Sequence, residues 1–571
     1  MALQWLSLVA AIWLQSVNGS NLNFPAYSSR LKQLLSLSQV QLNNLAFAND
    51  AGKLFGWFSG VAAAYLPLWV VLLIGSTLGF IGYGVQYLFL VNQITSLSFW
   101  QVFLLTAVAG NSICWINTVC YILAIQNFPL DRQVAVGLST SYVGLSAKIF
   151  TDIVDVVNVD SPAGERAKTY LLLNAALPLV VSAVAAPLAR DIKIGRSRSL
   201  AGGFSIMFVI TIATGVYAVI TSLGAGVSRI LPSYLSLTGM AAWLVFPVVV
   251  PIAEELKEQL QRKCWIRHDM KVYNQSEDEQ SASRSPPSGA TQSLPPPLPP
   301  SVWTESKECN SGPGLPPPSS LSGATQSLSL EGLSKERHAG LDGISSREEI
   351  GAKKMVTRID FWLYFFVYFF GATLGLVYLN NLGQIAESRG SSETSTLVSL
   401  SSSLSFFGRL LPSLYDYFFS KSKYRISRPA SIAATMVPMC GAFFLLLHGS
   451  HICLYISTGV IGICTGAITS IAVSTTTELF GAQNFGVNHN LLVTNIPIGS
   501  FLFGDMAALI YKREGRRHSS AGTGTCMGTT CFHTTFLIWG CLCSFGTLLA
   551  LVFHARTRSF YSHRQPVNAL P

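Results

Sequence analysis

The stretch LWVVLLIGSTLGFIGYGVQYLFLV, residues 68–91, contains no charged side chain. A helix that crosses the hydrocarbon core of a bilayer needs about 20 predominantly apolar residues. Inside lipid the backbone must also satisfy its own hydrogen bonds, which an uninterrupted helix does. The stretch therefore predicts a membrane-spanning helix, and the same criterion divides the rest of the chain.

The overall composition agrees with a membrane protein. Of the 571 residues, 50% are apolar and 12% are charged, and the mean hydropathy is +0.42. A soluble protein carries about 25% charged residues. The net charge of +10 comes from lysines and arginines scattered between apolar runs. No basic face with interleaved aromatic residues results, so nucleic-acid binding is not expected.

Fourteen segments meet the criterion for a membrane span, eight before a long polar interval and six after it. The predicted spans are residues 2–20, 46–64, 68–91, 99–124, 134–156, 169–189, 203–224, 233–252, 360–381, 395–414, 430–448, 452–475, 487–511 and 534–554. The first lacks the positively charged start of a secretory signal and is interpreted as a span. Lys148, Asp152 and Asp155 interrupt the fifth, so they should face the protein interior or lie near an end.

The polar interval, residues 253–358, is predicted to be a disordered linker. It contains PPPLPP at 295–300 and GLPPPSS at 314–320, and the heptapeptide SGATQSL occurs twice. Clusters of Pro, Ser and Gly cannot build a packed core. The predicted organisation is a transmembrane region over 1–252, the linker over 253–358, a six-helix bundle over 359–555 and a tail over 556–571.

The sequence lacks the motifs of an enzyme. It has no HExxH motif or metal-ligand cluster, and its nine histidines are dispersed. We therefore expect no catalytic residues, no metal and no cofactor. A filter-like repeat, which would suggest a channel, is also missing. A transporter is the favoured interpretation, and the alternative is a non-transporting membrane sensor or scaffold that signals through the proline-rich linker.

Polar amides in or beside the predicted spans are candidates for contact with a solute. They are Asn111, Asn117, Asn380, Asn381, Gln384 and Asn495. Hydrogen bonding between helices explains such residues equally well, and in membranes it contributes about 0.6 to 2 kcal/mol. Both interpretations fit each amide.

Small residues recur at steps of four in two stretches, which makes one face of each helix nearly flat. The two series are Gly462, Gly466, Ser470 and Ser474, and Gly52, Gly56 and Gly60. Such seams allow helix bundles to rock against each other, but they also allow static close packing.

The stretch FGVNHNLLVTNIPIGSFLFG, residues 485–504, keeps polar groups in an apolar setting. Asn488, Asn495 and Gly499 are expected on one helical stripe with His489 beside it. Asn488 is expected to cap the helix near a gate. Deeper in the span Pro497 frees a carbonyl and kinks the helix, so we expect Asn495, Pro497 and Gly499 to lie on the transport path.

Most of the eleven cysteines lie in apolar runs, where they are expected to act as small buried hydrophobes. Cys526 and Cys531 differ, because they lie in the Gly/Thr-rich loop AGTGTCMGTTCFH between two spans. A disulfide between them is possible if this loop faces an oxidising compartment.

Several long strings of the sequence are specific enough to compare with known families. They include AIWLQSVNGSNLNFPAYSSRLKQLLSLSQVQLNNLAFANDAGKLFGWFSG, IGYGVQYL, NSICWINTVCYILAIQNFP, DFWLYFFVYFFGATLGLVYLNNLGQIAES and GVNHNLLVTNIPIGS. These strings resemble plant nodulin-like proteins of the major facilitator superfamily, with the "nuclear fusion defective" type as the closest subgroup. The resemblance implies an all-α membrane fold of two six-helix bundles around a central cavity, with residues 203–224 and 233–252 as two inserted helices. It also implies alternating access, a cytoplasmic linker and cytoplasmic termini, with Cys526 and Cys531 on the far side of the membrane.

The superfamily pattern also includes a charged latch in the loop after the second helix of each bundle. GVAAAYLPLW, at 60–69, has no charge, whereas FFGRLLPSLYDYFFSKSKYRISR retains Gly408, Arg409, Asp416 and the basic run after Asp416. We therefore predict a gate stabilised from the second bundle, in which Arg409 pairs with Asp416, seven residues further on. A solvated charged loop is the alternative.

The expected partners are the lipid bilayer and a small solute whose identity the sequence does not specify. If protons are coupled to transport, a titratable group must lie in the cavity. By position in the sequence the candidates are Asp50, Lys148 and His489.

Overall fold

The computed structural model describes residues 2–158, 163–192, 201–222, 232–260, 349–391, 394–419, 427–518 and 526–562. Most of the predicted linker, at 261–348, and the end of the predicted tail lie outside these residues. Within the described residues every regular element is a helix, as expected for an all-α membrane protein.

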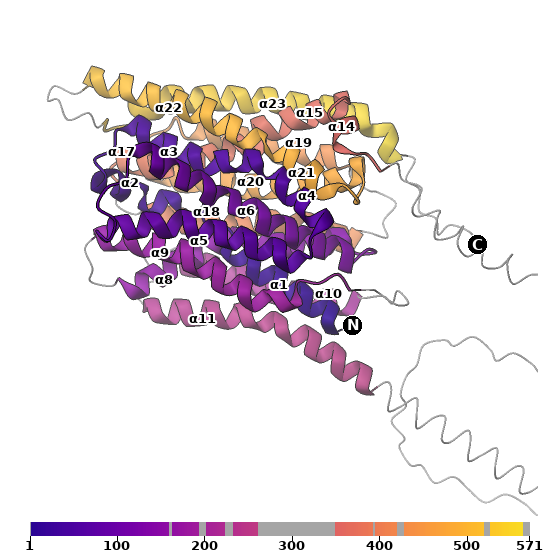
Figure 1. Ribbon diagram of the computed structural model, residues 1–571. Coiled ribbons are helices and arrows are strands. Elements are labelled where there is room, and N and C mark those ends of the chain that lie inside the picture. Colours follow the sequence, from indigo (N-terminus) through magenta and orange to yellow (C-terminus); the bar gives the residue numbers. More distant parts are fainter. Residues whose placement is uncertain are drawn as a thin grey trace, which may run out of the picture. The chain divides into compact units, whose positions relative to one another are not determined.

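The long helices run alongside one another (Figure 1). Before the linker the elements are α1 (Ala2–Val17), α2 (Phe24–Leu34), α3 (Gln39–Ala51), η1 (Gly52–Phe55), α4 (Trp57–Tyr65), α5 (Leu68–Leu90), α6 (Phe99–Asn127), α7 (Arg132–Ser141), η2 (Tyr142–Leu145), α8 (Ser146–Val157), α9 (Ala163–Ala185), η3 (Ala186–Leu188), α10 (Ala201–Ser222), α11 (Ser233–Val245) and η4 (Phe246–Val248). After it come α14 (Ala352–Met355), α15 (Ile359–Tyr368), the π-helical turn η5 (Phe369–Thr373), α16 (Leu374–Asn380), α17 (Leu382–Ser388), α18 (Thr394–Phe419), α19 (Arg428–Leu445), α20 (His451–Phe480), α21 (Phe485–Val493), α22 (Asn495–His518) and α23 (Thr530–Ser562).

Local sequence explains where several helices begin. Ser38 starts α3 with a capping box, because its hydroxyl accepts from Gln41 N at 3.2 Å while Gln41 Oε1 accepts from Ser38 N at 2.9 Å. Ser98 and Gln101 repeat this arrangement at the start of α6. Both serines thus satisfy backbone donors that have no partner inside the helix.

Ten helices in the described residues are long and apolar enough to cross a membrane. Four expected spans differ from this picture. Residues 2–20 give the shorter α1, residues 395–414 lie in the serine-rich α18, and residues 46–64 and 134–156 are interrupted by the 3₁₀ turns η1 and η2. Gly52 and Gly144 lie in these two turns, where glycine weakens a regular helix.

We call the elements from α1 to η4 the first half of the chain and those from α14 to α23 the second half. The two halves contact each other along several helix pairs. In the first half α5 packs against α6 and α9, and in the second α18 packs against α20 and α19 against α23. Between the halves, α7 contacts α18, α3 contacts α22, α4 contacts α21 and α2 contacts α17. The helices α10 and α11 contact α18 and α8 respectively, beside this boundary, and α11 follows the lower edge of Figure 1.

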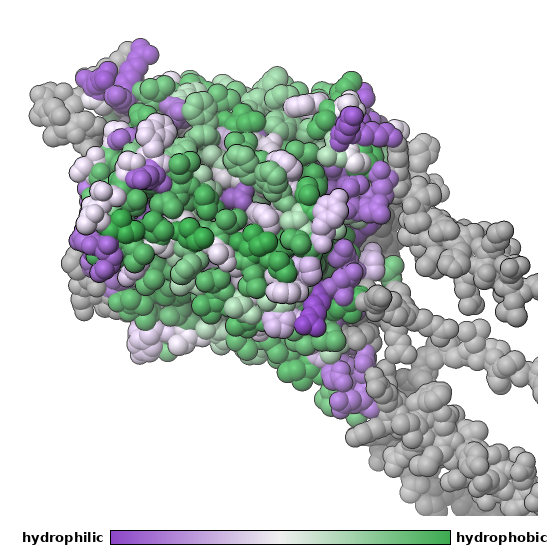
Figure 2. Space-filling view, viewed as in Figure 1, coloured by the Kyte–Doolittle hydropathy of each residue, from purple (hydrophilic) through white to green (hydrophobic). Residues whose placement is uncertain are grey.

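The surface fits a membrane environment. Figure 2 shows hydrophobic side chains over the middle of the visible face and hydrophilic ones gathered toward its two ends. Large apolar side chains such as Val209, Leu509 and Leu551 are more than half exposed. An apolar belt of this kind is costly in water and favourable in lipid. The protein is therefore an integral, multi-pass membrane protein.

Candidate functional site

At one end of the boundary between the halves, Ile350 N donates to Phe480 O at 3.1 Å. We call this the linker end, because Ile350, in the last part of the predicted linker, lies here. The opposite end of the boundary is called the far end. At the far end α2 meets α17. Gln384 Nε2 donates to Ser28 Oγ at 3.2 Å, and a Cβ on Gly383 would lie 2.8 Å from Pro25 O. Gln384 thus joins the two halves.

Charged and amide groups of α3, η1 and the end of α16 also meet across the boundary. The ammonium group of Lys53 lies 2.6 Å from Asp50 Oδ1, and both side chains are buried. Asn380 Nδ2 from the other half donates to Asp50 Oδ2 at 3.1 Å. Next to this group Asn43 Nδ2 donates to Asn381 Oδ1 at 3.1 Å. Asn380 and Asn381 therefore bridge the halves.

At the linker end a buried ionic network joins the halves. Arg428 Nη2 lies 2.8 Å from Asp416 Oδ2, and Arg428 Nε lies 3.5 Å from Glu478 Oε1. Gln133 on α7 accepts from Arg428 and donates to Glu478. Only Gln133 comes from the first half, so it carries the connection between the halves.

The predicted pair between Arg409 and Asp416 is wrong, because Asp416 pairs with Arg428. A separation of seven residues on a helix corresponds to a rise of about 10 Å, so a shared face does not bring the two groups together. Arg428 begins α19, the helix after the loop that follows α18, and this places it beside Asp416.

Two further contacts close the linker end. Asn490 Nδ2 donates to Thr118 Oγ1 at 2.9 Å and to Ser59 Oγ at 3.3 Å. A Cβ on Gly60 would lie 2.5 Å from the carbonyl carbon of Gly486, which shows how closely α4 approaches α21. The third glycine of the predicted seam therefore faces the other half of the molecule.

Asn488 has a different role from the helix cap that was expected. The helix α21 begins at Phe485 with Asn484 as its N-cap, so Asn488 lies inside the first turn and does not cap it. Its Nδ2 instead donates to Ile350 O at 2.8 Å. His489 is buried, with Nδ1 3.3 Å from Thr476 Oγ1 and its ring edge-to-face with Tyr121 at 5.5 Å.

The helix is interrupted just before Pro497. Because proline has no N–H, the carbonyl four residues earlier, of Val493, loses its helical partner. Val493 is the last residue of α21, and α22 starts at Asn495. Asn495 Oδ1 accepts from Thr373 Oγ1 at 2.9 Å and Asn495 Nδ2 donates to Phe365 O at 3.3 Å, so the side chain connects α22 to α15 and η5.

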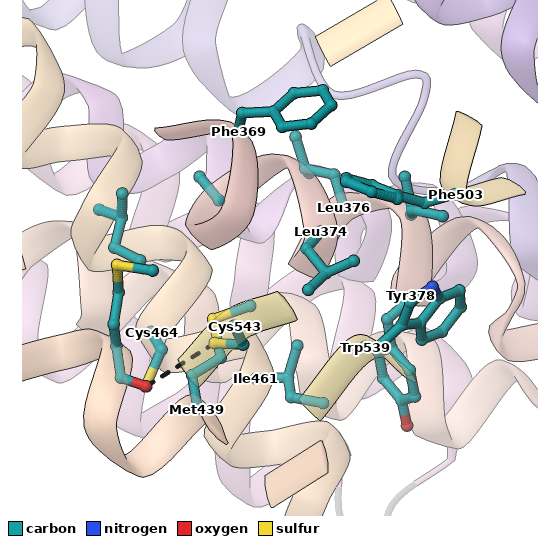
Figure 3. Close-up of a cluster of buried hydrophobic side chains, with 14 of the residues drawn as sticks. Phe369, Leu374, Leu376, Tyr378, Met439, Ile461, Cys464, Phe503, Trp539 and Cys543 are labelled. Atoms are coloured by element: carbon teal, nitrogen blue, oxygen red, sulfur yellow. Dashed lines mark hydrogen bonds between the residues drawn. The ribbon is translucent and has the colours of Figure 1, made fainter. Parts of the chain in front are cut away.

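Close packing fixes this junction. A Cβ on Gly499 would lie 2.4 Å from Thr373 Cγ2. Phe369 of η5 and Phe503 of α22 have ring centroids 4.8 Å apart, and both belong to the buried cluster in Figure 3. Asn495 thus has protein partners for both ends of its amide, which favours hydrogen bonding between helices over contact with a solute.

We predict that Asn495→Leu lowers the free energy of unfolding by about 1 to 2 kcal/mol, because the Thr373 hydroxyl and the Phe365 carbonyl lose their partner. Chemical unfolding of the purified protein in detergent measures this loss. A double-mutant cycle with Thr373→Val should give a coupling energy of about 0.6 kcal/mol. Additive effects of the two substitutions would show that the Asn495–Thr373 hydrogen bond contributes nothing.

The amides of α6 also have protein partners. Asn111 Nδ2 donates to Gly52 O at 2.7 Å and its Oδ1 accepts from Trp115 Nε1 at 2.7 Å. Asn117 Oδ1 accepts from Asn18 Nδ2 at 3.0 Å. These bonds stay within the first half, so Asn111 and Asn117 lie on its internal helix contacts.

The predicted seam of Gly462, Gly466, Ser470 and Ser474 lies on α20 and packs this helix against α18. Cβ atoms on Gly462 and Gly466 would lie 2.8 Å from Ser401 O and 2.3 Å from Ser405 O. Both helices belong to the second half, so this seam lies inside one bundle. Its geometry favours static close packing.

The remaining expected features lie apart from the boundary. A disulfide joins Cys526 to Cys531. Lys148 forms a buried ion pair with Asp152, as expected for charges that face the protein interior.

Arg409 lies in the middle of α18 and is 8% exposed. Its electrostatic neighbours are the phenol groups of Tyr121 on α6 and Tyr368 on α15. Sequence analysis proposed Arg409 but not the two tyrosines, since nothing distinguishes them from other aromatic residues of the spans. The sequence does not single out Gln133 or Glu478, although Glu478 is an acidic residue at the end of an apolar stretch. It indicates Arg428 only as a member of the basic run after Asp416.

Comparisons with known proteins identify relatives of the whole chain. The family described as Nodulin-like matches residues 4–252, and the family described as NFD4, C-terminal domain, matches residues 343–563. The chain is 37% identical over 577 residues to Protein NUCLEAR FUSION DEFECTIVE 4 of Arabidopsis thaliana, covering 98% of this chain and 90% of that protein.

Solved structures of transporters share the fold. A bacterial homolog of the human lysosomal transporter Spinster, in an inward-facing and unoccupied conformation, has a TM-score of 0.52 at 11% identity, over 99% of this chain and 98% of that chain. A proton:xylose symporter of the major facilitator superfamily has a TM-score of 0.51 at 11% identity, over 97% and 95%. The chain therefore has the major facilitator fold.

Proposed function

Because the chain belongs to the nodulin-like family and has the major facilitator fold, we propose that it moves a small solute across a membrane by alternating access. In this proposal α1 to α9 and α15 to α23 form two six-helix bundles, and α10 and α11 are the two inserted helices. Fourteen crossings result when the interrupted segments are counted as spans, and the linker lies on the cytoplasmic side.

The observation that supports alternating access most directly is the contact between the halves at both ends. Gln384 and Ser28 meet at the far end, and Gln133 meets Arg428 and Glu478 at the linker end. Hydrogen bonds and ion pairs between side chains can break and re-form without disturbing either bundle. Opening one end at a time would expose the region between them to each side of the membrane in turn.

We further propose that Asp50 is the proton-coupling group. Its carboxylate contacts Lys53 in its own half and Asn380 in the other half, so its charge affects both. Lys148 contacts Asp152 in its own half. His489 packs its ring against Tyr121 of the other half, but its Nδ1 lies against Thr476 in its own half. Proton coupling is the mode named for one neighbour of the same fold, the proton:xylose symporter.

A solute-uptake screen in proteoliposomes at two pH values tests these proposals. We expect uptake of at least one small solute by the wild type, faster with an inward proton gradient. Asp50→Asn should abolish the effect of the gradient while exchange of solute continues. If no solute and no proton flux responds to the protein, transport is not its function.

The scaffold alternative predicts a different dependence on the linker. Deleting residues 275–345 should leave most uptake activity if the protein is a transporter. A protein that signals through its proline-rich linker would lose its function with this deletion.

A further inference from the structure

Four lysine and arginine side chains are buried in the part of the chain that the structure describes: Lys53, Lys148, Arg409 and Arg428. Three of them contact a carboxylate, since Lys53 pairs with Asp50, Lys148 with Asp152 and Arg428 with Asp416. Arg409 forms no ion pair and no hydrogen bond to any described residue, and its Nε is buried without a partner.

A buried charge without a partner is costly, and proteins normally pair such groups or place them where they act. Arginine cannot relieve the cost by losing its proton, because it stays charged in proteins. An anion from outside the described chain would supply the counter-charge and a partner for the buried Nε.

The position of Arg409 suits a bound solute. It lies ten residues before the end of α18, which corresponds to a depth of about 15 Å along the helix. The linker-end network around Asp416 lies on one side of it, and the far-end contact at Gln384 lies on the other. Arg409 thus lies between the two closed ends of the boundary.

The surrounding groups come from both halves. Tyr121 belongs to the first half and Tyr368 to the second, and neither hydroxyl is hydrogen-bonded to a described residue. Each is a donor that remains available to an oxygen of a ligand. The ring of Tyr121 also packs edge-to-face with Phe485 at 5.9 Å, which adds an apolar aromatic wall.

We propose that Arg409 binds the carboxylate of a small organic monoanion, with the hydroxyls of Tyr121 and Tyr368 as further donors. This identifies the substrate class of the transporter, so it rests on the proposed function. A carboxylate fits the planar fork of the guanidinium group, which donates two parallel hydrogen bonds to it. A single negative charge is indicated, because the other buried cations already have carboxylate partners.

Matched pairs of acids and their amides test the proposal on the purified full chain. The probes are glycolate and glycolamide, lactate and lactamide, and benzoate and benzamide. We expect at least one acid to raise the unfolding temperature in detergent while its amide does not. In proteoliposomes uptake of that acid should exceed uptake of its amide by about tenfold or more, as expected for a charge-assisted hydrogen bond.

Variants of Arg409 separate ligand binding from a structural role. Arg409→Gln should abolish the response to the acid, yet leave the unfolding temperature without ligand unchanged or higher, because it removes an unpaired buried charge. Arg409→Lys should retain part of the response. A role in holding the fold would instead lower the unfolding temperature of Arg409→Gln. Arg166→Gln, at an ion pair whose two side chains are about one-third exposed, is the control and should respond like the wild type.

The outcomes distinguish this proposal from transport itself. If no acid stabilises the protein more than its amide does, or if chloride and phosphate stabilise it equally well, Arg409 does not bind a carboxylate. Uptake of neutral solutes with no preference for acids would overturn the substrate class and leave transport intact. Stabilisation by an acid without uptake of any solute would keep the anion site and overturn transport.

Discussion

Replacing Arg428 by alanine is expected to open the linker end and to lower the free energy of unfolding by about 3 to 5 kcal/mol. The change removes the cation that lies between Asp416 and Glu478, and Glu478 is only 4% exposed. The buried Glu478 and the partly buried Asp416 would then both lose the guanidinium group that lies against them. Gln133 would also lose its bond to the second half.

Two measurements check this result. Chemical unfolding in detergent reports the stability. A cysteine introduced by Ile122→Cys reports opening, because Ile122 of α6 lies near Gly486 across the boundary. We expect this cysteine to react faster with a bulky thiol reagent when Arg428→Ala is present than when Arg428 is intact. The reaction of the same proteins without Ile122→Cys gives the background to be subtracted.

Arg166→Ala is the matched control for Arg428→Ala. Arg166 pairs with Asp155, but both side chains are about one-third exposed, so this loss should cost no more than about 1 kcal/mol. Equal effects of the two substitutions, with no change in labelling, would show that the linker-end network does not hold the halves together.

The membrane character of the fold could be predicted from the sequence because apolar length is a local property. The long spans, such as residues 68–91 and 99–124, correspond to α5 and α6. The interrupted spans are harder to predict, since a 3₁₀ turn such as η1 depends on a glycine that packs closely against another helix. A Cβ on Gly52 would lie only 2.1 Å from Ala107 O, and that neighbour comes from a different span.

The polar groups of the candidate site could be predicted, but their partners could not. Asn43 and Asn381 are 338 residues apart in the sequence, and nothing local indicates that they meet. The mistaken pair between Arg409 and Asp416 shows the same limit, because it relied on spacing along one helix. The actual partner, Arg428, is brought to Asp416 by the reversal of the chain between α18 and α19.

A second large effect is expected for Gly60→Ala. The added Cβ would lie 2.5 Å from Gly486 C and 2.6 Å from Val487 N, and backbone atoms of this kind cannot move aside as a side chain can. The helix α4 itself should tolerate alanine, which has a better helix propensity than glycine by about 1 kcal/mol. The steric clash of the added Cβ is therefore with α21 of the other half. To relieve it, α4 and α21 must move apart at the linker end.

We expect Gly60→Ala to remain folded, to increase labelling of the Ile122→Cys reporter and to reduce uptake by about fivefold or more. The reason is that a cost of about 1 to 3 kcal/mol for overpacking shifts a two-state equilibrium by about 5- to 150-fold. Gly486→Ala should act in the same direction but more weakly, because its Cβ would lie 3.1 Å from Gly60 Cα.

Gly84→Ala supplies the control for this prediction, because a Cβ there meets only Ala175 Cβ at 3.9 Å, an ordinary contact inside the first half. This variant should match the wild type in uptake and in labelling. If Gly60→Ala also matches it, the approach of α4 to α21 is not a contact that must form during transport. Reduced uptake with unchanged labelling would place the defect inside the first bundle, because the linker end would then still close.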